Sequence, residues 1–332
     1  MGAMQAVVLD SHGGPEVLTL REVADPVPGP EEVLVQVVGT ALNRADLLQR
    51  MGLYPDPSPM SEHEIPGMEF AGRVIEVGPR VRSVRLGDEV MGIVSGGAYA
   101  ERLVTHERQV LPVPGPVALA DAATIPEVWI TAWDALVGQG GLRPGGTALV
   151  HAGASGVGTA AIQIVAATGA EVIVTTSTAK VAACVELGAH RVVDYTAEDF
   201  VDAVRAHTGG RGADVVLDVI GGDYLDRNVD AAAVGGRIIQ VGVMGSGSAT
   251  FSLGKLLPKR LTLTGTVLRP RPIEEKVAVT RRFGREVLPW FERGLVRPVI
   301  DRRYPLAAIA AAHEHMAANA NVGKILIDVA GD

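Results

Sequence analysis

The sequence of 332 residues is 47% hydrophobic but only 4% aromatic, and its length exceeds the usual size of a single hydrophobic core, which predicts two domains. The 30 Lys and Arg residues against 38 Asp and Glu residues give a net charge of −8, which disfavours nucleic-acid binding. No apolar run is long enough for a membrane helix and the N-terminus carries no signal pattern, so we expect a cytoplasmic protein with neither nucleic-acid nor membrane partners.

The N-terminal part, from Met4 to about Pro126, reads as a series of short β-strands. Residues 32–38 and 72–77 are rich in Val and Ile, and clusters of Pro and Gly separate such segments. Short strands interrupted by these turn residues are typical of β-rich domains. We therefore expect this part of the chain to be mostly β-sheet.

The chain after about Ile130 alternates strands with helices. This alternation implies crossover connections and a parallel sheet. Gly169 and Gly188 lie where helices would end, ahead of the second and third strands. We expect an α/β fold with a doubly wound Rossmann sheet, whose strands lie at residues 147–152, 171–176, 191–194, 214–219, 236–241 and 261–267.

The C-terminal part is expected to return to the β-rich domain. A helix over residues 306–318 precedes a short final strand, Lys324 to Val329, which needs a sheet to join. The N-terminal part is the expected host. The predicted domains are residues 1–126 and 269–332 together, with residues 127–268 between them as the nucleotide-binding domain.

A glycine-rich turn follows the first strand of the expected Rossmann sheet. Gly153, Gly156 and Gly158 have the pattern G-x-x-G-x-G, which departs from the common G-x-G-x-x-G order. Such a turn lets a dinucleotide pyrophosphate approach the backbone and the start of the next helix. The alternative is a tight turn with no ligand, but the succession of six strands favours cofactor binding.

The end of the second strand favours NADPH over NADH. NAD enzymes commonly place Asp or Glu there against the ribose hydroxyls. Here the strand continues through Ser177 to Lys180 without a carboxylate, and offers hydroxyls and an ammonium to a phosphate. Tyr195, after the third strand, is a further candidate. Lys180 could also be an ordinary solvent-exposed helix residue.

The sequence resembles the zinc-independent quinone oxidoreductases of the medium-chain dehydrogenase/reductase superfamily, most closely the p53-inducible subgroup. The resemblance implies a GroES-like catalytic domain formed by both chain ends, a Rossmann domain, a cleft at their junction for the nicotinamide, and homodimers or homotetramers. It rests on residues 42–50, 52–55, 66–72, 123–133, 149–158, 268–271, 304–305 and 321–325.

Zinc-dependent members of that superfamily carry metal ligands near positions 43, 67–69 and 127. Here those positions include Asn43, Met68 and Glu127, and amides and thioethers are poor zinc ligands. Cys184 is the single cysteine and is expected to be a buried, inert thiol. We therefore expect no metal.

The resemblance also implies two groups of site residues. Those that line the nicotinamide and substrate end are Asn43, Asp46, Tyr54 and Thr131. Those that bind the cofactor are Ser155, Gly156, Val157 and Gly158 at the pyrophosphate, Ser177, Lys180 and Tyr195 at the adenosine phosphate, and Gly242, Val243, Met244, Val267, Leu268, Arg269, Asn321 and Lys324 near the nicotinamide half.

Two of these assignments have structural alternatives. Tyr54 either donates a hydrogen bond or proton to the substrate oxygen or packs on the Pro-rich stretch that follows it. Lys324 either contacts the cofactor or is a surface residue at the start of the last strand. His151, which lies on an apolar strand, is expected to be a hydrogen-bonded core histidine.

The function that these observations favour is the NADPH-dependent reduction of a quinone or related conjugated carbonyl by hydride transfer. A conjugated acceptor is already electron-poor and needs no metal to polarise it. One alternative is reduction of an enoyl thioester on the same scaffold. An alternative of another class is a non-catalytic NADPH-binding sensor or scaffold protein.

Overall fold

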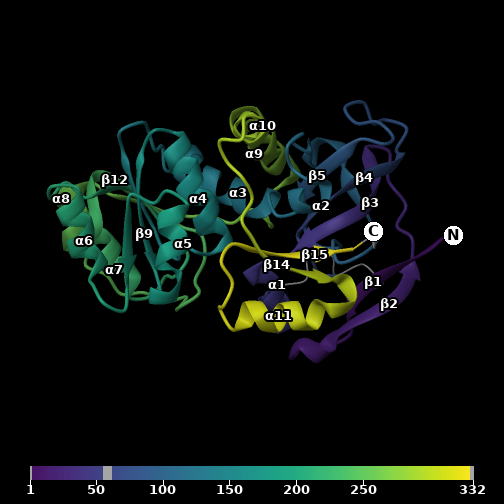
Figure 1. Cartoon of the computed structure of the whole chain (residues 1–332), viewed down its shortest axis with the longest axis horizontal. Helices are drawn as coiled ribbons and strands as arrows, with labels where there is room; N and C mark the ends of the chain where they lie inside the picture. Colours follow the sequence, from purple (N-terminus) through teal and green to yellow (C-terminus); the bar gives the residue numbers. More distant parts are fainter. Residues whose placement is uncertain (1, 55–61, 330–332) are drawn as a thin grey trace. The chain divides into compact units, whose positions relative to one another are not determined.

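The computed structural model describes residues 2–54 and 62–329. The chain divides into two compact units, one formed by Met1–Glu127 and Arg269–Asp332 and the other by Val128–Leu268. The first unit is thus built from both chain ends, purple to blue and yellow in Figure 1, and the second from the teal and green middle. No helix in these described ranges is long and apolar enough to cross a membrane.

The unit Val128–Leu268 contains the expected doubly wound sheet. Its six parallel strands have the order β10-β9-β8-β11-β12-β13. This is the Rossmann order 3-2-1-4-5-6, and it confirms the predicted fold class. The strands are β8 (Thr147–Val150), β9 (Glu171–Thr176), β10 (Arg191–Asp194), β11 (Ala213–Asp218), β12 (Ala232–Gln240) and β13 (Thr262–Gly265).

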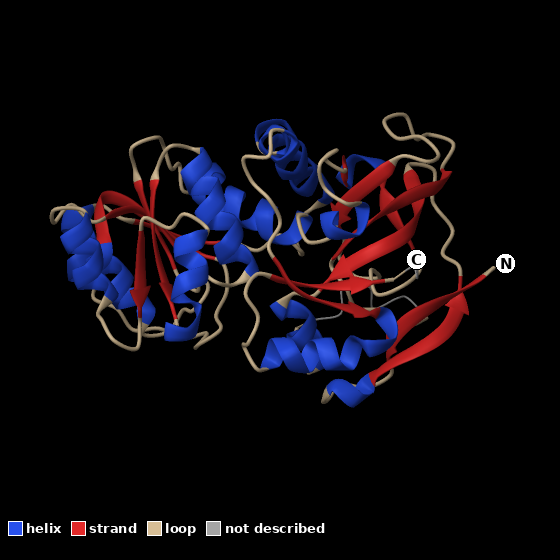
Figure 2. Ribbon diagram, in the orientation of Figure 1, coloured by secondary structure: helices blue, strands red, loops and turns tan. Residues whose placement is uncertain are grey.

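Helices cover both faces of this sheet (Figure 2), so its central strands are buried on both sides. They are α4 (Gly156–Ala167), α5 (Val181–Glu186), α6 (Phe200–His207), α7 (Tyr224–Ala231) and α8 (Leu253–Lys259); α3 (Pro126–Trp133) leads into a π-helical segment, Asp134–Gln139. Gly169 and Gly188 follow α4 and α5 with φ of 74° and 94°, a conformation that favours glycine. Both were expected at helix ends.

The other unit contains a seven-stranded sheet with the order β14-β15-β3-β4-β5-β7, in which β6 also pairs with β3. A separate hairpin of β1 (Ala3–Leu9) and β2 (Leu18–Ala24) accompanies it. The sheet strands are β3 (Glu32–Ala41), β4 (Glu69–Val77), β5 (Glu89–Ile93), β6 (Arg102–His106), β7 (Val110–Pro112), β14 (Ile300–Pro305) and β15 (Lys324–Asp328).

The final strand joins the N-terminal strands as expected. β15 pairs antiparallel with β3, with Leu326 opposite Ala41 and Asp328 opposite Gly39. The amide of Leu42 donates to the carbonyl of Ile325 just beyond this ladder. The pairing therefore brings the start of β15 beside residues 41–43.

The interpretation of residues 4–126 as mostly β-sheet named no helix, and so missed α1 (Arg44–Arg50) and the four-residue α2 (Leu119–Ala122). Asp46 lies in the first turn of α1, as the third helical residue, and accepts a hydrogen bond from the amide of Asn43, as in a capping box. The helix is too short to show clear helical periodicity in the sequence. The remaining helices of this unit are α9 (Ile273–Glu286), α10 (Leu288–Glu292) and α11 (Ile309–Ala317).

Candidate active site

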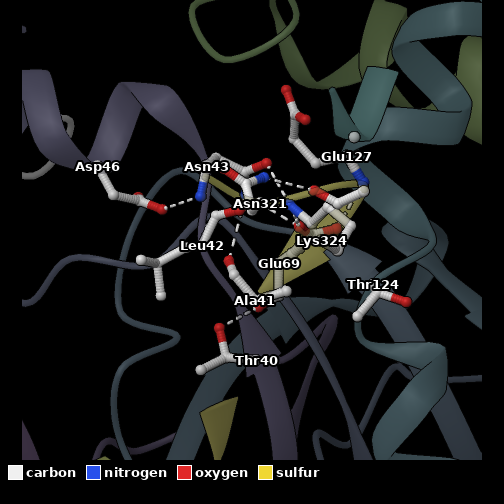
Figure 3. Close-up of polar contacts among 12 residues, drawn as sticks. Thr40, Ala41, Leu42, Asn43, Asp46, Glu69, Thr124, Glu127, Asn321 and Lys324 are labelled. Atoms are coloured by element: carbon white, nitrogen blue, oxygen red, sulfur yellow. Dashed lines mark hydrogen bonds and ion pairs between the residues drawn. The ribbon is translucent and has the colours of Figure 1, made fainter. Parts of the chain in front are cut away.

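A buried ion pair lies at the centre of a polar cluster in the unit formed by the chain ends (Figure 3). The Nζ atom of Lys324 is 2.7 Å from Oε1 of Glu69, and the two residues are 3% and 0% exposed. Nζ also donates to the carbonyl of Leu42 at 2.5 Å and to Oδ1 of Asn43 at 2.6 Å. These three acceptors match the three hydrogens of the ammonium.

The rest of the cluster is equally well paired. Nδ2 of Asn43 donates to Oε1 of Glu69 at 2.9 Å and to the carbonyl of Ala41 at 3.3 Å. The amide of Glu127 donates to the other carboxylate oxygen of Glu69 at 2.8 Å. The strands β3, β4 and β15 and the start of α3 each supply a member, so the cluster fastens four segments together.

These contacts change the interpretation of Lys324. A surface position is wrong, because the side chain is buried. Its three hydrogens are directed to protein oxygens, so it holds the cluster together rather than offering a hydrogen to a ligand. Asn321, also predicted at the cofactor, is 8% exposed and donates to the carbonyl of Gly323 at 2.8 Å.

Asp46 lies next to this cluster and is fully buried. Its Oδ2 accepts from the Asn43 amide at 2.8 Å and from the hydroxyl of Tyr99 at 3.1 Å. Burial raises the pKa of Asp46 to about 6, although the hydrogen bonds and the charges of Lys324 and Arg269 oppose this shift. Asp46 is therefore a carboxyl group that can exchange a proton near neutral pH.

Tyr54 packs against a cation. The guanidinium of Arg269 lies 4.9 Å from the centre of the Tyr54 ring. Arg269 in turn donates to the carbonyl of Ser95 at 2.6 Å and to Oε1 of Gln49 at 2.9 Å. Burial raises the pKa of Tyr54, so its phenol stays protonated. The Pro-rich stretch proposed as its packing partner, Pro55 to Pro59, lies outside the described residues.

The glycine-rich turn of the other unit connects β8 to α4. Ser155 caps the helix, its Oγ accepting from the amide of Gly158 at 3.0 Å. A Cβ at Gly153 would lie 2.6 Å from Cβ of Val174, and one at Gly158 would overlap the carbonyl of Ala152, so both glycines allow close packing. The first amides of α4, at Gly156 and Val157, have no carbonyl one turn earlier. This turn fits a pyrophosphate.

The residues expected at the adenosine phosphate follow β9 and β10. Ser177 precedes a short 3-10 turn, Thr178–Lys180, and Lys180 is partly exposed at the start of α5. Tyr195 is 51% exposed, and its amide donates to the carbonyl of Thr176 at 3.2 Å. The ends of the two neighbouring strands therefore present these side chains at one edge of the sheet.

The remaining predicted residues also follow strand ends of this sheet, apart from Thr131, which is 8% exposed on α3. Gly242, Val243 and Met244 follow β12, and the amide of Met244 donates to the carbonyl of Val219 after β11 at 3.0 Å. Val267 and Leu268 follow β13. The loops after β8, β9, β10, β12 and β13 thus carry the predicted cofactor residues of this unit.

Two members of the site, Glu69 and Tyr99, were not predicted from the sequence. Glu69 lies within the family segment 66–72, but no role was assigned to it. A carboxylate at the start of a largely apolar strand signals a buried partner, because unpaired charges are rarely buried. No local pattern signals Tyr99, whose contact with Asp46 joins distant parts of the chain.

Comparison with known proteins identifies relatives along nearly the whole chain. The family model described as alcohol dehydrogenase GroES-like domain matches residues 29–115, and that described as zinc-binding dehydrogenase matches residues 156–282. Quinone oxidoreductase-like protein 2 of Mus musculus is 33% identical, over 94% of this chain and 89% of its own length. Quinone oxidoreductase of Lama guanicoe is 31% identical, over 98% of this chain and 97% of its own length.

Two solved structures illustrate the breadth of the structural relatives. The crystal structure of an NAD-dependent alcohol dehydrogenase has a TM-score of 0.86 and 32% identity, with 98% of this chain and 100% of that chain covered. The crystal structure of CurK enoyl reductase has a TM-score of 0.87 and 26% identity, with 98% and 99% covered. The shared fold therefore hosts more than one reduction.

The zinc named in one family description does not fit the residues present. Asn43 and the buried Met68 offer an amide and a thioether, and both oxygens of Glu69 are hydrogen-bonded. The Lys324 ammonium places a positive charge beside these groups. Among the described residues, no group of three or more His, Cys, Asp or Glu side chains could hold a metal ion.

Proposed function

The chain belongs to the medium-chain dehydrogenase/reductase superfamily of oxidoreductases, and from this premise we propose that it reduces quinones or related conjugated carbonyls with NADPH and without zinc. The observation that carries the proposal is the ion pair of Lys324 and Glu69. This ion pair places an ammonium at the centre of the polar cluster, in the unit formed by both chain ends, and an ammonium cannot act as a Lewis acid toward substrate.

The Lys324 ammonium, in place of a metal ion, limits which substrates can accept the hydride. A metal ion would polarise a simple carbonyl and stabilise the oxyanion that forms on it. The hydrogens of Lys324 are already bonded to protein oxygens, so this group gives no such help. An acceptor whose conjugation already makes it electron-poor can be reduced without it, as a quinone or an enone can.

The end of β9 supports NADPH as the cofactor. Its last residues and the following turn, through Lys180, contain no carboxylate that would repel a 2′-phosphate. Ser177, Lys180 and Tyr195 would bind the phosphate, and the turn Ser155 to Gly158 the pyrophosphate. When bound, the nicotinamide supplies the hydride.

Tyr54 is our proposed hydrogen-bond donor to the acceptor oxygen. Its phenol is protonated because burial raises its pKa, and Arg269 holds its ring by a cation–π contact. A proton on this phenol can stabilise the negative charge that hydride addition creates on oxygen. Asn43 would act on the substrate indirectly, since its side-chain amide is hydrogen-bonded to Lys324, Glu69 and Ala41.

We also propose a homodimer or homotetramer built through the edge strand β13. Among the residues that the structure describes, this strand pairs with β12 alone, and Leu263 on it is 40% exposed. An open strand edge with an exposed apolar side chain is suited to pairing with a second copy. Small-molecule substrates are the other expected partners.

The test is NADPH oxidation by the purified protein with a small quinone, compared with crotonyl-CoA. We expect turnover of the quinone. Turnover of the thioester alone would replace the proposal with enoyl thioester reduction, which the structural similarity to CurK enoyl reductase makes the second candidate. Tight NADPH binding without reduction of any quinone or enal would instead identify a sensor or scaffold.

A further inference from the structure

Four buried polar side chains form a chain of hydrogen bonds through the unit Val128–Leu268. Oγ1 of Thr175 lies 3.0 Å from Nδ1 of His151, and Nε2 of His151 lies 2.7 Å from Oδ1 of Asn228. Nδ2 of Asn228 donates to Oδ2 of Asp218 at 2.8 Å. All four residues are at most 2% exposed. His151 is thus the hydrogen-bonded core residue that the sequence predicted.

Asp218 determines which group donates in each of these hydrogen bonds. Its Oδ1 accepts from the amides of Ile220 at 2.6 Å and Gly221 at 3.1 Å, while Oδ2 accepts from Asn228. A carboxylate has no hydrogen to give, so each of these bonds runs toward Asp218. The amide nitrogen of Asn228 must therefore face Asp218.

The remaining bonds follow from that orientation. With its nitrogen turned to Asp218, Asn228 presents only an acceptor oxygen to the ring of His151. Nε2 must then carry the hydrogen, and Nδ1 of the neutral ring is left as an acceptor. The hydroxyl of Thr175 donates to it. The carboxylate thus determines the tautomer of a histidine with which it has no direct hydrogen bond.

The surroundings of His151 keep its ring neutral. The rings of Phe200 and Tyr224 stand edge-on to it, each with a centroid separation of 4.8 Å. The guanidinium of Arg227 lies 4.2 Å from the centre of the Phe200 ring. Burial lowers the pKa of His151 and Arg227 lowers it further, while Asp218 and the Asn228 hydrogen bond act in the opposite direction.

The two end members of this series of hydrogen bonds, Thr175 and Asp218, hold the loops that carry the predicted cofactor residues. The carbonyl of Thr175 accepts from the amide of Gly153 at 2.8 Å, and His151 directly precedes Ala152, whose φ of 55° starts the phosphate turn. At the other end, Asp218 holds residues 220–221, and its own carbonyl accepts from the amide of Val241 at 2.8 Å.

We propose that Asp218, acting through Asn228, His151 and Thr175, is a positioning residue for these loops, and that it does so by fixing His151 as the Nε2-protonated tautomer. Hydrogen-bonded groups behind a binding site commonly orient the groups that touch the ligand. The ligand named in the binding test, NADPH, rests on the proposed function. The direction of the hydrogen bonds does not.

The first test replaces the carboxylate, with Asp218→Asn. Its oxygen can keep the bonds from residues 220 and 221, while its nitrogen donates toward Asn228. That residue must then turn round, which places its nitrogen against Nε2 of His151 and moves the ring hydrogen to Nδ1. We expect histidine-selective ¹⁵N NMR to show this change of tautomer, with the His151 signals assigned from His151→Gln.

A matched control lies on the same strand. Asp214→Asn removes the same charge at the opposite end of β11, where the carboxylate accepts from the amide of Thr147 at 2.8 Å. We expect it to leave the tautomer of His151 as in the unmodified protein. The proposal is overturned if unmodified His151 is Nδ1-protonated or cationic at neutral pH, or if Asp218→Asn leaves its tautomer unchanged.

The second test measures NADPH binding by fluorescence titration. We expect Asp218→Asn and Thr175→Val to weaken binding about tenfold, because Asp218→Asn reverses the hydrogen bonds that link the loops and Thr175→Val leaves Nδ1 of His151 without its donor. Thr175→Ser retains the hydroxyl and Asp214→Asn lies outside the chain, so both should bind as the unmodified protein does. Folding of each variant is checked by circular dichroism.

The outcomes separate this inference from the proposed function. Unchanged affinity in both Thr175→Val and Asp218→Asn would overturn the positioning role, even if the tautomer were as expected. Thr175→Val is a nearly isosteric change and answers the question if Asp218→Asn does not fold. Failure of the unmodified protein to bind NADPH would instead count against the proposed cofactor, and the NMR result would stand independently.

Discussion

Lys324 and Glu69 carry opposite charges at positions from which water is almost excluded. Removing one partner of such a pair leaves the other charge buried without compensation, which costs more than the pair contributes. The structure adds a second cost, because the carbonyl of Leu42 and Oδ1 of Asn43 would lose their donor. Removal of either partner alone should therefore destabilise this part of the protein strongly.

We predict that Lys324→Met lowers the free energy of unfolding by about 3–5 kcal/mol. Adding Glu69→Gln to this variant should recover much of the loss, because the unpaired charge is then removed as well. Urea denaturation of the single and double variants measures both effects. Equal stability of the two variants would show that the buried charge is not the main cost.

Asp46 gives the protein a specific pH dependence. Its pKa in the folded state is about 6 and exceeds the ordinary value of 3.8. Between these two values the folded state binds more protons than the unfolded state, so this group lowers stability as pH rises from about 4 to 6. Its contribution is then constant at higher pH.

The corresponding prediction compares Asp46→Asn with the unmodified protein. Between pH 4 and 7, the unmodified protein should lose on the order of 3 kcal/mol of unfolding free energy relative to the variant, since one pKa unit corresponds to about 1.4 kcal/mol. Denaturation curves at several pH values measure the difference. Parallel stability profiles for the two proteins would contradict it.

Lys180 tests the choice of cofactor at the level of one side chain. Lys180→Glu would place a carboxylate where we expect the 2′-phosphate and should weaken NADPH binding by at least about tenfold, with little effect on NADH. Titration of both cofactors provides the comparison. Equal losses for the two would show that Lys180 does not recognise the phosphate.

Some helices and strands have a clear sequence pattern and others do not. The central strands of the parallel sheet, β8 and β11, are rich in apolar residues because both of their faces are buried, and the glycines that follow α4 and α5 have positive φ. Helix α1 was missed, since seven residues give no clear period. Its Asn43-x-x-Asp46 spacing was the available sign.

The start of α4 is the element on which cofactor binding depends most. Ser155→Ala removes the side-chain oxygen that accepts from Gly158 and should lower the unfolding free energy by about 1 kcal/mol. It should also weaken NADPH binding, because the amides of the turn lose their fixed orientation. Thr168→Ala, at the other end of the same helix, is the control and should leave binding unchanged.

At the scale of the whole molecule, the sequence predicted the doubly wound Rossmann sheet and the return of the last strand to the N-terminal sheet. It could not predict the burial of Lys324 or the series of hydrogen bonds that links Thr175 to Asp218 through His151 and Asn228. Both depend on residues far apart in sequence, and lysine and aspartate are seldom buried. Local spacing contains no information on such pairings.

The proposed reaction uses NADPH, reduces a conjugated acceptor and needs no zinc. The most direct test is NADPH consumption with para-benzoquinone by protein that has been treated with a strong chelator and then freed of it. We predict that the treated protein retains its turnover and that added zinc does not increase it. Loss of turnover after chelation, with recovery on adding zinc, would contradict the account.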